Sequence, residues 1–437
     1  MAGRDRDGPM ANDSGTRSLS LTRRHATAVM VSAMAATVQP AASAVPVSTG
    51  ADRLARDSFR TFGSRRVGLV TNQTGRTGGR HLVDAMAAAG VKLAAILAPE
   101  HGFRGDIEAG KGVRDGRDAR TGIPIRSLYG ATQKPTPAML AGLDVLVFDI
   151  QDIGARFYTY ISTMGLAMQA AAEARLPFVV LDRPNPLGGT YVDGFVLELA
   201  HRSFVGQYPM PIVHGLTVGE LARMIKGERW LDSLGQLSLE VVELQGWQRT
   251  MRWPATGLPW VATSPNIPTF ASALVYPGIG MIGELTVNEG RGTPTPFELF
   301  GASWLDGEKL AARLNAQRLA GVRFEPHSYT PRAIANIAAN PRFEGKRLTG
   351  VRVVVTDVDA VRPLAIGMHA MALIVAEAKA KGIAPIYGND SMFRRIAGTR
   401  RLQQMLEAGA EGPAIIAAWK AKVAAFETRR APYLLYR

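Results

Sequence analysis

Carboxylates, amides and arginines recur directly after short apolar runs in the first half of the chain. A carboxylic acid can protonate a leaving oxygen, a second carboxylate can stabilise or attack an electron-poor carbon, and an arginine can bind an anion. One such group would be explained by a salt bridge or a helix cap, but four groups together predict a polar pocket suited to chemistry. The four groups are Asn72 and Gln73; Glu100 and His101; Asp149, Gln151, Asp152, Arg156 and Tyr158; and Asp182, Arg183 and Asn185.

The apolar runs before these groups are predicted to be buried strands separated by helices. Strands are expected at 66–70, 92–97, 125–128, 145–150 and 178–181, where the series closes. Helical stretches are expected at 81–89, 137–143 and 159–174. This alternation predicts a mostly parallel sheet covered on both faces. Ligands of such sheets bind beyond the carboxyl ends of the strands, which is where the polar groups lie.

The remainder of the chain is expected to form a smaller α+β domain. With 437 residues the chain is long enough for two cores, and a stretch rich in Pro, Trp and Ser at 253–277 is the predicted junction. Beyond it, helices are expected at 296–300, 307–317 and 368–381, and a strand at 351–356. The predicted domains are therefore 53–265 and 275–437.

The first 44 residues have the three parts of a secretory signal peptide. A basic lead contains Arg23 and Arg24, a small apolar run covers 26–38, and Ala42-Ser43-Ala44 offers a cleavage site. A disordered basic tail is the alternative. We expect export, by the Sec or the twin-arginine route, to the periplasm or the exterior after cleavage near Ala44. No later segment is interpreted as long and apolar enough to span a membrane, and the absence of cysteine suits an oxidising compartment.

Charge and short motifs argue against several functions. The net charge of +14 can attract anionic cell-wall polymers or can belong to a solvated surface, and its scattered arginines argue against nucleic acid. Gly105 to Lys111 spells G-x-x-x-x-G-K, but Gly112 replaces the magnesium-binding hydroxyl and no apolar strand leads into the loop. Zinc-protease and serine-hydrolase motifs are absent from the sequence. Asp149 and Asp152 have no histidine at supporting spacing, so no metal site is predicted.

Longer motifs run in order through most of the chain. They are GLVTNQTG (68–75), APEHGFRG (98–105), TGIPIRSLYG (121–130), LVFDIQDIGARFYTY (146–160), VLDRPNPLGG (180–189), SPNIPT (264–269) and EGRGTPTPFELFGA (289–302). In these motifs the sequence resembles the exo-β-N-acetylmuramidase family typified by NamZ. The resemblance implies an α/β fold: a Rossmann-like, mostly parallel catalytic domain, a smaller α+β C-terminal domain, and a cleft between them. It also implies release of N-acetylmuramic acid from the non-reducing ends of peptidoglycan fragments, without nucleotide or metal cofactors.

Within this resemblance Glu100 is the predicted general acid, because it lies in a strand-end loop and in the E-H-G motif. His101 would orient it or shuttle its proton, or is simply structural. The second catalytic group is left open between Asp149, Asp152 and Glu289, and the 2-acetamido group of the substrate can also act as the nucleophile. Each of these carboxylates has a structural alternative, such as a hydrogen-bond anchor or a turn.

Substrate binding is predicted for a wider set of residues. Arg156, Arg183 and Arg291 are candidate clamps for the lactyl carboxylate of N-acetylmuramic acid, of which one or two are expected to touch the ligand. Tyr158 and Trp260 can stack on a sugar or belong to the core, and His214 can line the cleft or begin a helix. The remaining predicted contacts are Asn72, Gln151, Asp182, Asn185 and Asn266.

Two other functions are compatible with the sequence. A periplasmic glycan-binding protein would close a two-domain cleft on a sugar without turnover. The second is a hydrolase that cleaves another bond of the same polymer, such as an acetyl ester.

Overall fold

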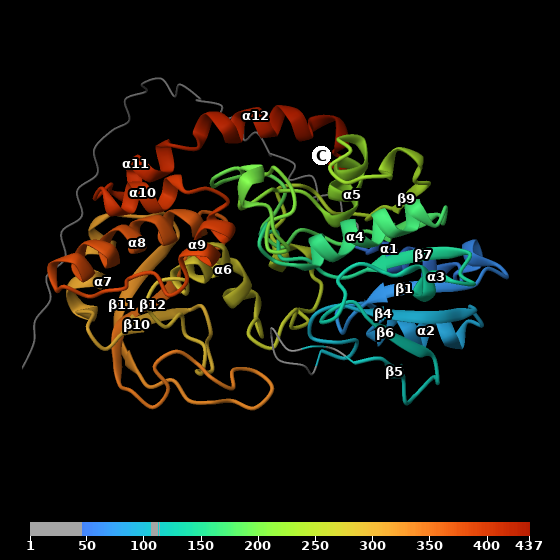
Figure 1. Ribbon diagram of the computed structural model, residues 1–437, viewed down its shortest axis with the longest axis horizontal. Coiled ribbons are helices and arrows are strands. Elements are labelled where there is room, and N and C mark those ends of the chain that lie inside the picture. The colour runs from blue at the N-terminus through green and yellow to red at the C-terminus, as the bar shows by residue number, and fades with distance from the viewer. Residues whose placement is uncertain (1–45, 106–111, 113) are drawn as a thin grey trace, which may run out of the picture. The chain divides into compact units, whose positions relative to one another are not determined.

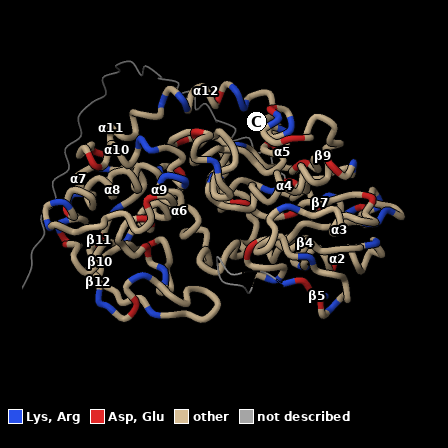
Figure 2. The backbone as a smooth tube through the Cα atoms, viewed as in Figure 1, with Lys and Arg blue, Asp and Glu red and all other residues tan. Residues whose placement is uncertain are grey.

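The computed structural model describes residues 46–105, 112 and 114–437. Residues Val45–Arg437 form one compact unit. The predicted signal peptide and most of the G-x-x-x-x-G-K run lie outside the described residues. In Figure 2, basic and acidic residues are interspersed along the described chain.

A seven-stranded sheet in the order β5-β6-β4-β1-β7-β8-β9 organises the first part (Figure 1). Its neighbours are all parallel except β5 and β6. Without β5, the strands run 3-2-1-4-5-6 in chain order, as in the doubly wound dinucleotide-binding fold. The predicted Rossmann-like sheet is confirmed. The strands are β1 (Val67–Thr71), β4 (Leu93–Ala98), β5 (Gly116–Arg117), β6 (Pro124–Ser127), β7 (Val145–Asp149), β8 (Phe178–Leu181) and β9 (Leu239–Val242).

Helices cover both faces of the sheet. Because successive side chains of a strand point to opposite faces, alternate residues of the central strands pack against one helical layer or the other. Val145 and Val147 of β7 pack in the cluster of α1 (Gly50–Arg56) and α2 (Leu82–Ala88). Leu146 and Phe148 pack in the cluster of α4 (Tyr160–Glu173) and α5 (Val218–Gly227). The short helix α3 (Pro137–Leu140) and a hairpin of β2 (Arg76–Thr77) and β3 (Arg80–His81) complete this part.

Local signals explain where the helices begin. The His81 ring accepts a hydrogen bond from the backbone N–H of Val83 at the start of α2. Thr217 and Glu220 form a reciprocal capping box at the start of α5. These caps orient the two helices against the sheet.

The second part contains a three-stranded antiparallel sheet in the order β10-β12-β11. The predicted smaller α+β region is confirmed. Its strands are β10 (Leu299–Ala302), β11 (Val322–Tyr329) and β12 (Leu348–Val355). Its helices are α6 (Phe270–Ile282), α7 (Gly307–Ala316), α8 (Pro363–Ala380), α9 (Asp390–Ala397), α10 (Arg401–Glu407), α11 (Gly412–Ala417) and α12 (Lys420–Arg430).

One described helix, α8, is long and apolar enough to cross a membrane by length and composition, and 67% of it is buried in the structure. It packs closely along α6, and glycine at position 278 of α6 permits this: a Cβ there would lie only 2.0 Å from the Pro363 carbonyl oxygen. The expectation that no later segment has such length and composition is therefore wrong. Its burial is that of a core helix.

Three details of the predicted elements differ from the structure. Residues 296–300, predicted as a helix, form a turn that leads into β10. The parallel series does not close at 178–181, because β9 adds a further strand. The junction segment is partly ordered as α6, which contains Pro277.

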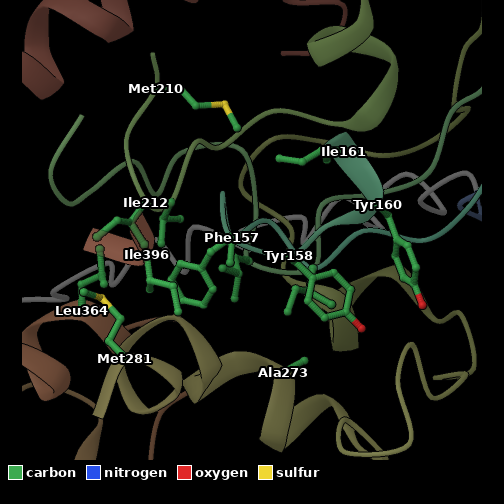
Figure 3. Packing of buried hydrophobic residues seen from close by; sticks show 14 of the residues in the cluster. Phe157, Tyr158, Tyr160, Ile161, Met210, Ile212, Ala273, Met281, Leu364 and Ile396 are labelled. Carbon is green, nitrogen blue, oxygen red and sulfur yellow. The ribbon is translucent and has the colours of Figure 1, made fainter. Parts of the chain in front are cut away.

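One hydrophobic cluster joins the two parts. Phe157, Ile161 and Ile212 pack in the same cluster as Ala273, Met281, Leu364 and Ile396 from the second part (Figure 3).

The end of the chain returns to the first sheet, and α12 leads it there (Figure 1). The Tyr436 hydroxyl donates to Asp182 Oδ2 at 2.5 Å, and the Leu435 N–H donates to Glu220 Oε1 at 2.9 Å. The chain therefore crosses between the two parts twice.

Candidate active site

A cavity of about 230 Å³ lies where the end of β4 and the start of α4 meet α6 and α9. Five of the predicted site residues line it: Glu100, His101, Tyr158, Asn266 and Arg291. The cavity thus draws on both parts of the chain, as the cleft implied by the family resemblance would.

Glu100 follows β4 and is held by two hydroxyl groups. Thr159 Oγ1, just before α4, donates to Glu100 Oε2 at 2.9 Å. The Tyr129 hydroxyl also hydrogen-bonds Glu100, and burial together with the Glu100 charge raises the pKa of Tyr129, so this phenol keeps its proton. The carboxyl group is therefore oriented before any substrate arrives.

The backbone is strained at two residues of the cavity lining. His101 has φ 69° and is only 4% exposed, and Phe297 has φ 66°. Left-handed backbone at a bulky residue costs of order 1–3 kcal/mol and persists where the surroundings enforce it, often at functional sites. His101 and Glu100 are both part of the lining.

The opposite wall carries a cation between acidic side chains. Arg291 Nη1 lies 2.5 Å from Glu289 Oε1, and the Arg291 side chain remains 40% exposed. Burial, followed by the neighbouring Glu289 charge, raises the pKa of Glu284, another residue of the lining. Glu289 packs so tightly that a Cβ on Gly283 would lie 2.9 Å from its carboxyl carbon.

Aromatic rings form the floor between these walls. Tyr276 makes edge contacts with Phe297 and Tyr158, with centroids 4.8 Å and 5.8 Å apart. The hydroxyl of Tyr158 donates to Thr263 Oγ1 at 2.8 Å, and that of Tyr160 donates to the Thr263 carbonyl at 2.7 Å. In Figure 3 the Tyr158 and Tyr160 rings lie beside each other near Ala273 of α6. A rigid apolar surface beside polar groups suits a sugar.

Comparisons with known proteins agree over nearly the whole chain. Family models described as "Exo-beta-N-acetylmuramidase NamZ, N-terminal" and "C-terminal" match residues 67–271 and 274–436. The peptidoglycan beta-N-acetylmuramidase NamZ of Bacillus subtilis (strain 168) is 40% identical over 398 residues, which cover 89% of this chain and 91% of the relative. The chain belongs to the exo-β-N-acetylmuramidase NamZ family. The resemblance seen in the motifs is confirmed.

Solved structures support the same fold. A DUF1343 family protein of Bacteroides fragilis NCTC 9343 superposes with a TM-score of 0.82 at 38% identity, covering 90% of this chain and all of that one. A second DUF1343 protein of the same organism gives a TM-score of 0.73 at 32% identity, with 90% and 99% coverage.

In this member of the NamZ family, the predicted acidic residues of β7 and β8 lie outside the cavity lining. Asp149 is fully buried, and Arg183 donates to its two oxygens at 2.6 and 2.9 Å. Asp182 accepts hydrogen bonds from Thr217, Gly219 and Tyr436, and burial raises its pKa to about 7. These contacts favour structural roles for Asp149, Asp182 and Arg183.

Arg156 also has a structural environment. It is fully buried, and its guanidinium donates to the carbonyls of Phe195, Met210 and Ile396 at 2.7–2.8 Å. These bonds tie α9 to the first part of the chain. Arg291 is therefore the candidate clamp that lines the cavity.

Three predicted polar residues hydrogen-bond neighbouring loops and do not line the cavity. Asn72 Oδ1 accepts from the Thr74 backbone and hydroxyl. Asn185 Nδ2 donates to the Leu216 carbonyl. Asp152 Oδ2 accepts from the Gly154 N–H at 2.7 Å.

Other predicted residues also lie away from the lining. His214 Nε2 is buried 3.6 Å from Asp152 Oδ2, and Trp260 packs on Trp253 and Phe270. Gln151 lines a different cavity. Within the described residues no group of three or more His, Asp or Glu side chains is arranged to hold a metal ion.

Sequence reasoning missed several residues of the lining and its support: Tyr129, Thr159, Tyr276, Glu284 and Phe297. Tyr129, Thr159 and Phe297 lie inside the recognised motifs, so motif membership could have pointed to them. Tyr276 lies outside those motifs and nothing in the sequence marked it as part of the site, whereas Glu284 lies shortly before the motif that begins at Glu289.

Proposed function

We propose that this chain is an exo-acting glycosidase that releases N-acetylmuramic acid from the non-reducing ends of peptidoglycan fragments, with Glu100 as the general acid. Membership of the NamZ family supports the reaction and the substrate class. The observation that carries the residue assignment is the placement of Glu100, oriented by two hydroxyls, in a cavity that also contains Arg291.

In the proposed reaction Glu100 transfers its proton to the glycosidic oxygen as the bond from that oxygen to C1 breaks. The positive charge that develops on the sugar ring needs a nucleophile or a nearby negative charge. Asp149, Asp152 and Glu289 do not line the cavity, whereas Glu284 does, and Glu289 is paired with the lining residue Arg291. This geometry favours either the acidic wall or the 2-acetamido group of the substrate for the second role.

Arg291 is proposed to bind the lactyl carboxylate. Its guanidinium is partly exposed in the cavity lining and keeps donors beyond the one directed to Glu289. Arginine pairs with carboxylates through two parallel hydrogen bonds, which fixes the orientation of the sugar. The basic lead, the apolar run and the A-x-A site of residues 1–44 support the further proposal that the enzyme acts outside the inner membrane.

Release of N-acetylmuramic acid from a disaccharide whose leaving group is a second sugar, by the chain without residues 1–44, tests the proposal. Glu100→Gln is expected to lower kcat by about 100-fold or more, because general acid catalysis contributes about 10²–10⁴-fold. Glu325→Gln, a matched change on β11, is the control and is expected to retain activity. Binding of muropeptides without release of N-acetylmuramic acid would instead identify a glycan-binding protein, and a different product mass would identify hydrolysis of another bond.

A further inference from the structure

Tyr276 of α6 lines the cavity that contains Glu100, and its ring is held there on several sides. The rings of Phe157, Tyr158 and Phe297 have their centroids 5.2, 5.8 and 4.8 Å from that of Tyr276. One turn later on α6, a Cβ at position 280 would lie 3.1 Å from the Tyr276 ring, so glycine there leaves room for it. These contacts fix the position of the ring in the lining.

The hydroxyl group of Tyr276 is available to a ligand. The hydroxyls of the neighbouring Tyr158 and Tyr160 are used by the protein, because both donate to Thr263. Among the described residues the Tyr276 hydroxyl has no hydrogen-bond partner, and it is not one of the fully buried polar atoms without a partner. Because the residue is half-buried and belongs to the cavity lining, we infer that its free hydroxyl is reached from the cavity.

The phenol lies near charged groups of both cavity walls. Burial raises the pKa of Tyr276, and the charges of Arg291, Glu100 and Glu284 also act on it. The phenol therefore keeps its proton at neutral pH and is an uncharged hydrogen-bond donor. It is close both to the proposed acid, Glu100, and to the proposed carboxylate clamp, Arg291.

The order of the groups around the sugar ring indicates which one meets this donor. In N-acetylmuramic acid C1 carries the glycosidic oxygen, C2 the acetamido group and C3 the lactyl ether. If Glu100 acts at C1 and Arg291 binds the group on C3, a donor close to both faces the substituent on C2. An uncharged phenol suits the uncharged amide carbonyl, whereas the lactyl carboxylate pairs better with the guanidinium of Arg291.

We propose that the Tyr276 hydroxyl donates to the carbonyl oxygen of the 2-acetamido group and so selects sugars that carry an N-acetyl group. The proposal rests on the proposed function and adds the residue that recognises the acetyl group. The same contact orients the amide, which is one of the candidates for the second catalytic role.

Titration calorimetry on the Glu100→Gln chain tests the contact without turnover. The ligands are the disaccharide of N-acetylmuramic acid and N-acetylglucosamine, and its analogue with a hydroxyl at C2 of the muramic unit. Tyr276→Phe removes the hydroxyl alone and is expected to weaken binding of the N-acetylated disaccharide by about threefold to tenfold. Binding of the analogue is expected to stay the same. Tyr433→Phe, a matched change outside the lining that loses a hydrogen bond to Glu228, is the control and is expected to bind both ligands as its parent does.

Equal binding of the N-acetylated disaccharide with and without Tyr276→Phe would overturn the assignment and leave the proposed hydrolysis intact. Equal weakening of both ligands would overturn it as well, because Tyr276 would then contact a group that the two share, such as the lactyl carboxylate. If the disaccharide binds neither protein, the proposed substrate is wrong and the assignment falls with it.

A crystal of the Glu100→Gln chain with the disaccharide gives a second measurement that needs no substitution of Tyr276. A distance of about 3 Å or less between the Tyr276 hydroxyl and the acetamido oxygen supports the contact. An acetamido group directed away from Tyr276 refutes it.

Discussion

Arg291 offers the sharpest test of substrate recognition, because N-acetylmuramic acid differs from N-acetylglucosamine by the lactyl group alone. Replacing Arg291 with methionine keeps an unbranched side chain against Phe297, whose ring centroid lies 5.0 Å from the guanidinium carbon. The substitution removes the charge and all the hydrogen-bond donors. Its effect should therefore appear only with substrates that carry the lactyl carboxylate.

The expected magnitude follows from the kind of bond that is lost. A hydrogen bond to a charged group contributes about 1.5–3 kcal/mol, which corresponds to about tenfold to a hundredfold in kcat/KM. The 40% exposure of the Arg291 side chain places the effect toward the lower end, because solvent screens the interaction. Arg291→Lys keeps the charge beside Glu289 but loses the paired geometry, so we expect an intermediate loss.

The assay compares kcat/KM for a β-N-acetylmuramide and the matching β-N-acetylglucosaminide in the parent, Arg291→Lys and Arg291→Met proteins. The muramide value is expected to fall while the glucosaminide value stays the same. An equal fall for both substrates would refute the assignment, since it would show that Arg291 acts by holding Glu289. An unchanged muramide value would refute it as well.

Three further outcomes follow from the buried contacts. Arg156→Met should destabilise the fold in urea unfolding, because three buried carbonyls lose their donor and each one left unpaired costs about 1–3 kcal/mol, and the KM of the folded fraction should not change. The Asp182 carboxyl, whose pKa burial raises to about 7, binds its proton more tightly in the folded protein than in the unfolded chain. Stability relative to Asp182→Asn should therefore be greatest below about pH 4 and decline by at most about 4 kcal/mol as the pH rises through 7, as urea unfolding across this range would show. Gly283→Ala should displace Glu289 and destabilise the fold by about 1–3 kcal/mol, with a measurable loss of muramide hydrolysis.

The parallel sheet was predictable because its central strands are continuous apolar runs. β1, β7 and β8 are buried at every position, and their sequences contain no competing helical period. Of the strands that escaped prediction, β9 and β11 are less buried, whereas β10 is buried at every position. β9 is an edge strand with one buried residue, Val242. β11 contains Pro326, which fits an edge strand but in the sequence indicates a break.

The site was predictable only in part, for a geometric reason. A strand end places a polar residue at the correct edge of the sheet, but its side chain can turn toward a cavity or toward another strand. Glu100 lines the cavity, whereas Asp149 turns to Arg183. Arg156 and Arg291 are chemically equal in sequence, and only the packing of α9 against the first part of the chain separates a structural guanidinium from one that lines the cavity.

The return of Tyr436 to Asp182 has a mechanical consequence. In a polypeptide whose two parts were joined at a single place, one part could rotate freely relative to the other. Here the segment before α6 and the segment after α12 both connect the parts, so any rotation of one part against the other has to leave both connections in place. Cutting the chain after α12 would remove the second connection and leave the segment before α6 as the remaining covalent link between the parts.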